Sequence, residues 1–301
     1  MTVEAFVSAE SVEEAVAAMA GGARAVAGGT DLVVGARQGK APLPASLVAI
    51  HRLEELRGIE ARGGAVRFGA LATHADVVAS AVVRERLTAL ADASAIVGSH
   101  ATRAHGTLGG NVMNASPAME TGGPLICFGA TVTLRSAEGS RTVAVEDLFS
   151  GPGQTVAAAG ELLTEVSVPE PAPGTGSCYL RLEYRRQMEI AVVGVTAVVT
   201  LDAGTVGEAR VAITALAPTI RRAPVAEAAL AGTGGGPDAV ASAAAAAAAA
   251  AAPISDVRAS EAYRRAMAEV IARRAIEAAL ARARGETVRI PASPNLHGGL
   301  A

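Results

Sequence analysis

The stretch AHGTLGGNVMNASPAMETGG, from Ala104 to Gly123, is rich in glycine, asparagine and small hydroxyl residues and has few large apolar ones. A folded protein orders such a segment only where its backbone N–H and C=O groups find partners. A second glycine-rich stretch, AVAGGTDL, spans Ala25 to Leu32. Glycine lets backbone N–H groups approach an anion closely, and helix N-termini add positive potential there. We therefore expect the two stretches to bind a diphosphate from two sides; two ordinary turns are the alternative.

Composition argues against several classes of protein. The net charge is −3 and aromatic residues make up 2% of the chain, so we expect no nucleic-acid partner. No stretch of about 20 residues has membrane character, and the N-terminus lacks the apolar core of a signal peptide. We expect a cytoplasmic protein without a membrane span.

Cysteine and histidine usage argues against a metal centre in this chain. There are two cysteines, Cys127 and Cys178, whereas a thiolate-bound iron–sulfur cluster usually needs about four. We expect both cysteines to be buried and reduced. His100 and His105 lie in the polar segment without an H-E-x-x-H motif or a paired Cys/His set, so we expect no metal site.

The chain of 301 residues is long for one hydrophobic core, which rarely exceeds about 250–300 residues. The segment order is α/β, then α+β, then a sheet followed by helices, which predicts an α+β protein. We expect an N-terminal unit over 1–57, a middle unit over 58–173, a third unit over 174–290 and a tail over 291–301. The predicted local elements are a helix capped by Ser8 or Ser11, a hairpin over 58–70 around Gly63 and Gly64, a helix after Thr73, a helix over 83–95, a polar loop after it, three strands from about 178 to 217, and a helix over 260–284.

Two other nucleotide-binding motifs are incomplete. GPGQTV (Gly151–Val156) begins like a Rossmann fingerprint but lacks the third glycine, and GARQGKA (Gly35–Ala41) is one residue too short for a Walker A loop. Neither supports a nucleotide site of those classes.

The segment LRLEYRRQMEIAVVGV, from Leu180 to Val195, contains several charged residues. Two hypotheses remain open for it: a charged edge strand with ion pairs, or a basic group that faces a bound anion or an electron-rich cofactor ring. The residues concerned are Arg181, Arg185, Arg186, Glu183 and Glu189.

Six segments occur in an order that resembles the FAD-binding medium subunits of molybdenum hydroxylases. This family includes the flavoprotein subunit of aerobic carbon monoxide dehydrogenase and the FAD domain of xanthine dehydrogenase. The resemblance covers nearly the whole chain, and its most specific part is the GTLGGNVMNASP block with AGGTDL upstream. The segments are AGGTDL, RAHGTLGGNVMNASPAMET, SGPGQT, ELLTEVSVP, MEIAVVGV and SDVRASEAYRR.

The resemblance implies a fold and a cofactor site. The fold is the two-subdomain FAD-binding fold of the vanillyl-alcohol-oxidase (PCMH) type, followed by a C-terminal three-stranded antiparallel sheet with helices. FAD is expected between the first two units, and valine at Gly109 or Gly110 is expected to displace its diphosphate. The implied FAD-binding residues are Ala27, Gly28, Gly29, Thr30, Asp31, Leu32, Val97, Thr107, Gly109, Gly110, Asn111, Asn114, Ser116, Glu120, Leu163 and Arg181.

Four residues depart from the pattern of that family. Glu120 stands where relatives often have aspartate, and Arg181 where they often have lysine. His100 and His105 stand where relatives often have glutamine and asparagine or another residue. The lysine-to-arginine change keeps the positive charge but spreads the hydrogen-bond donors.

The resemblance also implies a function and partners. The chain is expected to be an electron-transfer subunit that takes electrons from a [2Fe–2S] small subunit, alongside a molybdopterin large subunit, and passes them through FAD to NAD, a quinone or another acceptor. FAD supplies that chemistry, so no catalytic side chain is expected. The alternatives are a stand-alone FAD-dependent oxidoreductase of the same fold, or a structural assembly subunit, because a fold does not fix a function.

Overall fold

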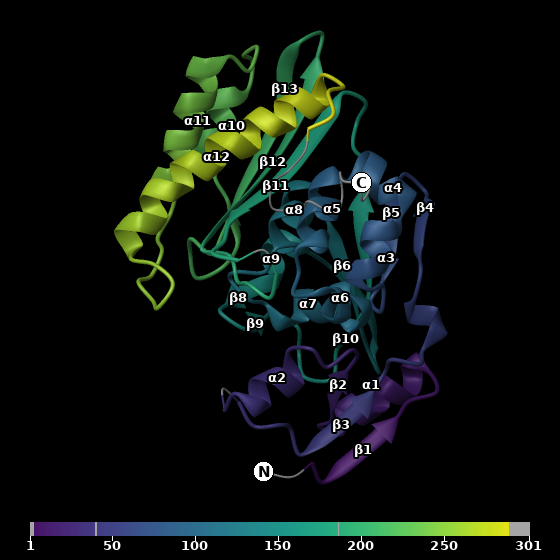
Figure 1. Ribbon diagram of the computed structural model, residues 1–301. Coiled ribbons are helices and arrows are strands. Elements are labelled where there is room, and N and C mark those ends of the chain that lie inside the picture. Colours follow the sequence, from purple (N-terminus) through teal and green to yellow (C-terminus); the bar gives the residue numbers. More distant parts are fainter. Residues whose placement is uncertain (1–2, 40, 186, 289–301) are drawn as a thin grey trace.

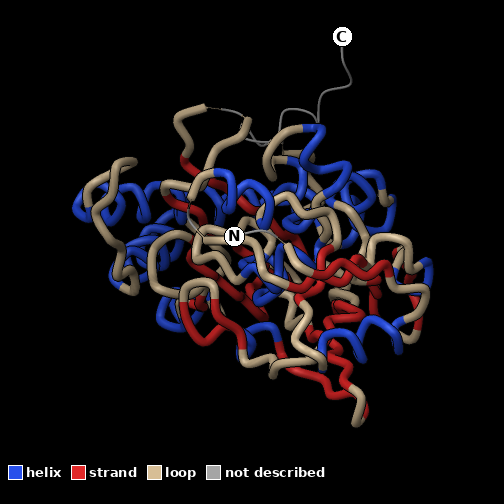
Figure 2. Tube along the Cα trace, turned by 90° about the horizontal axis from the view of Figure 1, so that it is seen from below, coloured by secondary structure: helices blue, strands red, loops and turns tan. Residues whose placement is uncertain are grey.

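The computed structural model describes residues 3–39, 41–185 and 187–288. Its three main sheets follow one another along the molecule, with the N-terminal sheet at the bottom of Figure 1 and the C-terminal sheet at the top. Figure 2 shows the chain from below, where both helices and strands reach the outer edge of the molecule. This arrangement confirms the α+β class. Arg186 and the tail predicted over 291–301 lie outside the described residues.

The N-terminal sheet is parallel, with the strand order β1-β3-β2. Its elements are β1 (Ala5–Ser8), α1 (Val12–Ala20), β2 (Arg24–Val26), α2 (Leu32–Arg37), β3 (Ser46–Ala49) and the 3-10 turn η1 (Glu54–Leu56). Ser11 caps α1, since its Oγ accepts a hydrogen bond from the Glu14 backbone N at 3.1 Å. The strand β1 was not predicted, because all four of its residues are exposed and show no alternation of buried and exposed positions.

The middle sheet has the strand order β4-β5-β10-β6-β7. The elements of this region are β4 (Ile59–Arg62), β5 (Ala65–Gly69), α3 (His74–Ala79), α4 (Ala81–Arg86), α5 (Thr88–Ala95), α6 (His100–His105), α7 (Leu108–Asn114), α8 (Gly122–Cys127), β6 (Thr131–Ser136), β7 (Gly139–Ala144), α9 (Val145–Leu148), β8 (Phe149–Gly151), β9 (Gln154–Thr155) and β10 (Leu162–Pro169). The predicted hairpin is present, and Gly63 and Gly64 turn it with φ of 63° and 74°. Thr73 caps α3 in a capping box with Asp76, as the sequence predicted.

Two predictions about this region are wrong. The helix expected over 83–95 is two helices, α4 and α5, which are separated at the buried Leu87. The polar loop expected after it contains α6 and α7. Ser99 and Thr107 cap these short helices, because their side-chain oxygens accept hydrogen bonds from the backbone N of Thr102 and of Gly110. Capping thus outweighs the weak helix propensity of the glycines.

The C-terminal sheet is antiparallel, with the strand order β11-β12-β13-β14. The elements are β11 (Thr175–Leu182), β12 (Val193–Asp202), β13 (Thr205–Thr214), β14 (Arg221–Arg222), α10 (Pro224–Leu230), α11 (Pro237–Ala249) and α12 (Glu261–Ala283). The three predicted strands are present, and the two-residue β14 extends the sheet. The helix predicted over 260–284 is α12, which Ser260 caps.

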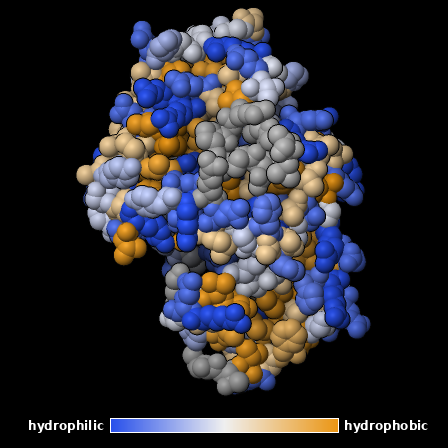
Figure 3. Space-filling view, in the orientation of Figure 1, coloured by the Kyte–Doolittle hydropathy of each residue, from blue (hydrophilic) through white to orange (hydrophobic). Residues whose placement is uncertain are grey.

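Apolar side chains are exposed on the N-terminal unit. Figure 3 shows apolar surface on the lower part of the molecule, where Figure 1 places this unit. Phe6 is 62% exposed, and Val33 and Val34 are 41% and 45% exposed. Surface of this kind is typical of protein–protein contacts.

Within the described ranges, no helix is both long and apolar enough to cross a membrane.

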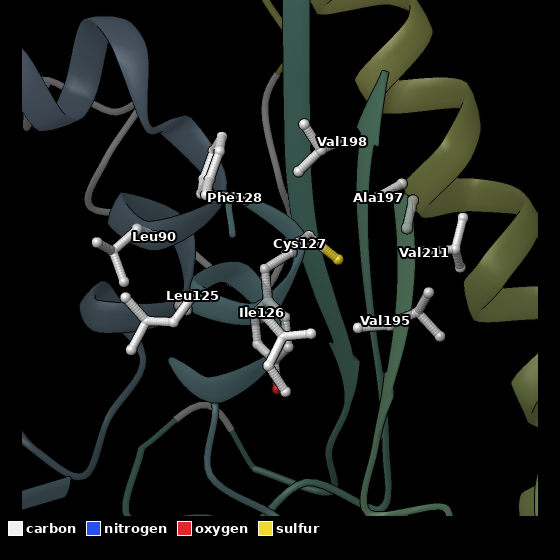
Figure 4. Close-up of a cluster of buried hydrophobic side chains, with 14 of the residues drawn as sticks. Leu90, Leu125, Ile126, Cys127, Phe128, Val195, Ala197, Val198 and Val211 are labelled. Atoms are coloured by element: carbon white, nitrogen blue, oxygen red, sulfur yellow. The ribbon is translucent and has the colours of Figure 1, made fainter. Parts of the chain in front are cut away.

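The main core joins the middle region to the C-terminal sheet. Figure 4 shows Leu125 and Cys127 of α8 between Leu90 of α5 and the strand residues Val195 and Val211. All five side chains are buried. Burial raises the pKa of the Cys127 thiol, so this cysteine stays neutral and acts as a packing residue. The two regions therefore share one continuous apolar interior.

Candidate functional site

The structure brings the two glycine-rich stretches together. Gly28 packs directly against the end of α6: a Cβ on Gly28 would overlap the carbonyl oxygen of His105 and lie 2.6 Å from its carbonyl carbon. A Cβ on Gly106 would lie 3.4 Å from Thr30 Oγ1. Only glycine at residue 28 permits this approach of the two backbones. Residues 28–30 and 105–106, which we call the glycine junction, therefore form one site.

The other residues predicted in the first stretch surround this junction. Ala27 is half-buried and packs against the N-terminal core. Gly29 has a φ of +67°, which favours glycine. Asp31 precedes α2 without capping it, and Leu32 begins that helix. The segment thus turns from β2 into α2 at the junction.

The backbone N–H groups at the start of α7 are bound to protein acceptors. Leu108 N donates to Ala72 O at 2.8 Å, and Gly109 N donates to Ala70 O at 3.1 Å. Gly110 N donates to Thr107 Oγ1 at 3.0 Å. These bonds fix α7 beside the segment that follows β5. Direct FAD contacts by Thr107, Gly109 and Gly110 stay predictions. In the structure, each of these residues takes part in a hydrogen bond that holds the start of α7 in place.

The reason given for the effect of valine at Gly109 needs correction. A Cβ on Gly109 would lie 2.7 Å from Ala70 O, so its first obstacle is the protein backbone. Gly110 is exposed, and a Cβ there would lie 2.9 Å from the capping Thr107 Oγ1. Valine at either residue would therefore disturb α7 directly, whether or not a diphosphate lies nearby.

Asn111, Asn114 and Ser116 are half-buried on α7 and just after it. Asn111 Oδ1 accepts a hydrogen bond from Thr121 Oγ1 at 2.6 Å, which leaves the amide nitrogen as its donor. Ala115 lies between Asn114 and Ser116 in the left-handed region with a φ of 49°. Cofactor contacts by the three polar residues stay predictions.

Glu120 and Arg181 bind each other, although they are 61 positions apart in the sequence. Arg181 Nη1 lies 2.5 Å from Glu120 Oε1, and Arg181 Nε lies 2.5 Å from Glu183 Oε2. The Arg181 side chain is fully buried, and its Nη2 has no hydrogen-bond partner within the described part of the chain. Burial lowers the pKa of Arg181, but the two carboxylates and Tyr179 outweigh it, so the net shift is upward.

The two hypotheses for the charged segment now have partial answers. Arg181 lies on β11, an edge strand of the C-terminal sheet, and is in ion pairs, as the first hypothesis states, but its side chain is buried. Arg185, which is exposed, pairs with the half-buried Glu189 at 3.3 Å. Burial raises the pKa of Glu120 although Arg181 opposes this shift. The unpartnered Arg181 Nη2 keeps the second hypothesis open.

Val97 lies in a turn that is held from two sides. Its carbonyl oxygen accepts a hydrogen bond from Arg103 Nη1 at 2.9 Å. The next residue, Gly98, has a φ of +53°, and its carbonyl accepts from Met188 N at 2.9 Å. Arg103 lies within the motif RAHGTLGGNVMNASPAMET, but its residue type and spacing alone indicate no role.

A cavity lies between the N-terminal unit and the middle region. Its volume is about 270 Å³, and its lining includes Gly22, Arg24, Met113 of α7, Ala157 and Glu161. Leu163 is buried two residues after Glu161 at the start of β10. The cavity thus lies between the two units that the resemblance places on either side of FAD, but none of the predicted FAD-binding residues is among its lining residues. A larger groove of about 760 Å³ lies between α11 and α12, away from the predicted site residues.

His74 is a buried histidine under the glycine junction. It is 1% exposed, its backbone N donates to Gly106 O at 3.0 Å, and its Nδ1 has no partner within the described ranges. Burial, and then the positive charge of Arg103, lowers its pKa to about 4. His74 is therefore neutral at pH 7.

This shift predicts a loss of stability in acid. Unfolded histidine has a pKa near 6.5, so between pH 6.5 and pH 4 the unfolded chain binds a proton that the folded chain excludes. The free energy of unfolding therefore falls as the pH falls through this window. From pH 7.5 to pH 5 we expect His74 to account for a loss of about 2 kcal/mol. Urea unfolding of the wild type and of His74→Gln at both pH values measures this loss. If the free energy of unfolding depends on pH equally in the two proteins, His74 is not its cause.

Comparisons with known proteins show the family of the chain. A family model described as the FAD binding domain in molybdopterin dehydrogenase matches residues 2–171. A second model, described as the CO dehydrogenase flavoprotein C-terminal domain, matches residues 178–279. Together they cover most of the chain.

Individual relatives match over most of their length. The carbon monoxide dehydrogenase medium chain of Hydrogenophaga pseudoflava is 34% identical over 79% of this chain and 83% of that protein. The corresponding chain of Afipia carboxidovorans is 33% identical over 87% and 90%. A solved carbon monoxide dehydrogenase structure from Hydrogenophaga pseudoflava superposes with a TM-score of 0.90 and 35% identity, over 93% of this chain and 98% of that one. These matches confirm the fold class and the FAD cofactor.

Proposed function

The chain belongs to the FAD-binding medium subunits of the molybdenum hydroxylases, and we propose that it accepts electrons from a [2Fe–2S] partner subunit and passes them through FAD to NAD, a quinone or another acceptor. It is thus a subunit of an oxidoreductase. The observation that carries the proposal is the glycine junction, where Gly28 meets the backbone of His105.

The residues present fit FAD. The junction has no room for a side chain at Gly28, and a cavity of about 270 Å³ lies where the N-terminal unit meets the middle region. Residues 27–32, Asn111, Asn114 and Ser116 would hold the cofactor from the two sides. When bound, FAD supplies the redox chemistry, and this chain binds and orients it.

Three observations support partner subunits. Cys127 and Cys178 are buried, free thiols, and two cysteines fall short of the roughly four that an iron–sulfur cluster usually takes. The relatives are named as medium chains, which implies further chains in those enzymes. The exposed apolar side chains on the N-terminal unit suit a subunit interface. We propose an iron–sulfur small subunit and a molybdopterin large subunit as the partners.

The proposal also includes a location and a division of the chain. Free, buried thiols agree with a cytoplasmic location. Each of the units 1–57, 58–173 and 174–290 contains one of the three main sheets. Limited proteolysis with cleavage near residues 57 and 173 would support these boundaries.

Anaerobic reduction of the FAD-loaded chain tests the electron path. We expect absorbance near 450 nm to bleach when the chemically reduced iron–sulfur partner is added, and to return when the correct acceptor follows. Mixing with NAD and with a quinone analogue in turn identifies the acceptor. Rapid bleaching by an organic substrate without any partner would favour the stand-alone oxidoreductase instead.

A further inference from the structure

Arg103 is a buried arginine without a carboxylate partner. It is 7% exposed on α6, two residues before the His105 carbonyl that packs against Gly28. Its Nη1 donates a hydrogen bond to the carbonyl oxygen of Val97 at 2.9 Å. Among the residues that the structure describes, no Asp or Glu lies within salt-bridge distance of it.

The charged residues that act on Arg103 add to the excess of positive charge around it. Arg181, itself fully buried, lies close enough to lower the pKa of Arg103 further, after burial, which is the larger cause. Arg103 in turn helps to keep His74 neutral. Arg181 is compensated by Glu120 and Glu183, so Arg103 supplies the uncompensated positive charge of this group.

Other buried arginines of the chain are paired with a carboxylate. Arg264 and Arg282 are also buried, and each is paired with an aspartate, Asp256 or Asp92. A buried charge without such a partner is costly, and proteins keep one where a ligand or a function compensates it. Arg103 therefore differs from these structural arginines.

The surroundings of Arg103 indicate the kind of ligand. Its guanidinium donates a hydrogen bond to the Val97 carbonyl, and the positive charge of Arg181, whose Nη2 has no partner within the described ranges, acts on it. The resemblance implies FAD contacts at both residues, and at Val97 another family member has an aromatic side chain that contacts the flavin ring. We propose that Arg103 is a positioning and charge-supplying residue at the ring end of the FAD site, where it holds the Val97 turn and makes the bound flavin easier to reduce. This inference rests on FAD binding by the chain, and it is independent of which partner or acceptor is used.

The midpoint potential of bound FAD tests the proposal. In Arg103→Gln the side chain can still donate to the Val97 carbonyl, but the charge is gone. We expect the equilibrium constant for two-electron reduction of bound FAD to fall about tenfold, a shift of roughly 30 mV to more negative potential. Arg103→Lys keeps the charge and should retain most of the wild-type potential. Arg84→Gln removes an exposed arginine from α4 and should leave it unchanged.

Spectroelectrochemical titration measures these potentials on the full chain, with its partner subunits present if the chain alone releases FAD. Urea unfolding without FAD is measured in parallel, and we expect Arg103→Gln to be as stable as the wild type, because it removes an uncompensated buried charge. A folded Arg103→Gln with the wild-type potential would overturn the proposal. Failure of that variant to fold would also overturn it, since it would show that Arg103 is needed for structure. A wild-type chain that binds no FAD would instead contradict the site as a whole.

Discussion

Alanine at Gly28 should lower the affinity for FAD by about 100-fold. The added methyl group would overlap the His105 carbonyl, so residues 28–30 and α6 would have to separate. That separation widens the glycine junction on which the proposed diphosphate contacts depend. Titration of the chain with FAD, followed by visible absorbance, measures the loss.

A matched control is available seven residues away. Gly35 lies in α2, and a Cβ built there meets no atom within 4 Å. Gly35→Ala should therefore bind FAD like the wild type. Far-ultraviolet circular dichroism checks that both variants fold. If folded Gly28→Ala binds FAD within twofold of the wild type, the diphosphate is not held at this junction.

Alanine at Arg282 should lower the free energy of unfolding by about 3–5 kcal/mol, the usual cost of leaving a buried charge unpaired. Arg282, near the end of α12, lies 2.6 Å from Asp92 of α5 through Nη1 and 3.2 Å through Nη2. It also donates to the Ser177 carbonyl of β11 at 2.6 Å. Asp92 is 1% exposed, and it also accepts a bond from the Tyr179 backbone N. One ion pair thus joins three elements from the middle and C-terminal regions.

An exposed ion pair serves as the control for this prediction. Arg86 Nη1 lies 2.8 Å from Glu170 Oε2, but their side chains are 49% and 32% exposed. Arg86→Ala should cost less than about 1 kcal/mol. Equilibrium urea unfolding compares the two variants. If Arg282→Ala costs no more than Arg86→Ala, the buried pair does not stabilise the junction between the two regions.

Local signals in the sequence predicted much of the fold. Gly63 and Gly64 mark the β4–β5 hairpin, and Thr73 followed by Asp76 marks the start of α3. Such signals act over a few residues, so one sequence is enough to find them. Ser99 and Thr107 are equally local caps, but the glycines after Thr107 obscured α7.

The pairing of distant residues could not be predicted in this way. The residues implied by the resemblance included both Glu120 and Arg181, yet nothing in the sequence indicates that they bind each other. Arg103 was missed because its distinguishing feature is the lack of a carboxylate nearby, which only the folded chain shows. The edge strand β1 was missed because it has no buried face. Burial and long-range contacts, not residue type, define these features.

The central claim is that this chain binds one FAD between the glycine-rich segments of its first two units. The most direct measurement is the visible absorbance of the purified chain, titrated with FAD and repeated after co-expression with its partner subunits. The account predicts saturation at one FAD per chain, with the shifted and structured bands of a protein-bound flavin. A spectrum that stays that of free FAD, even with the partners present, would contradict it.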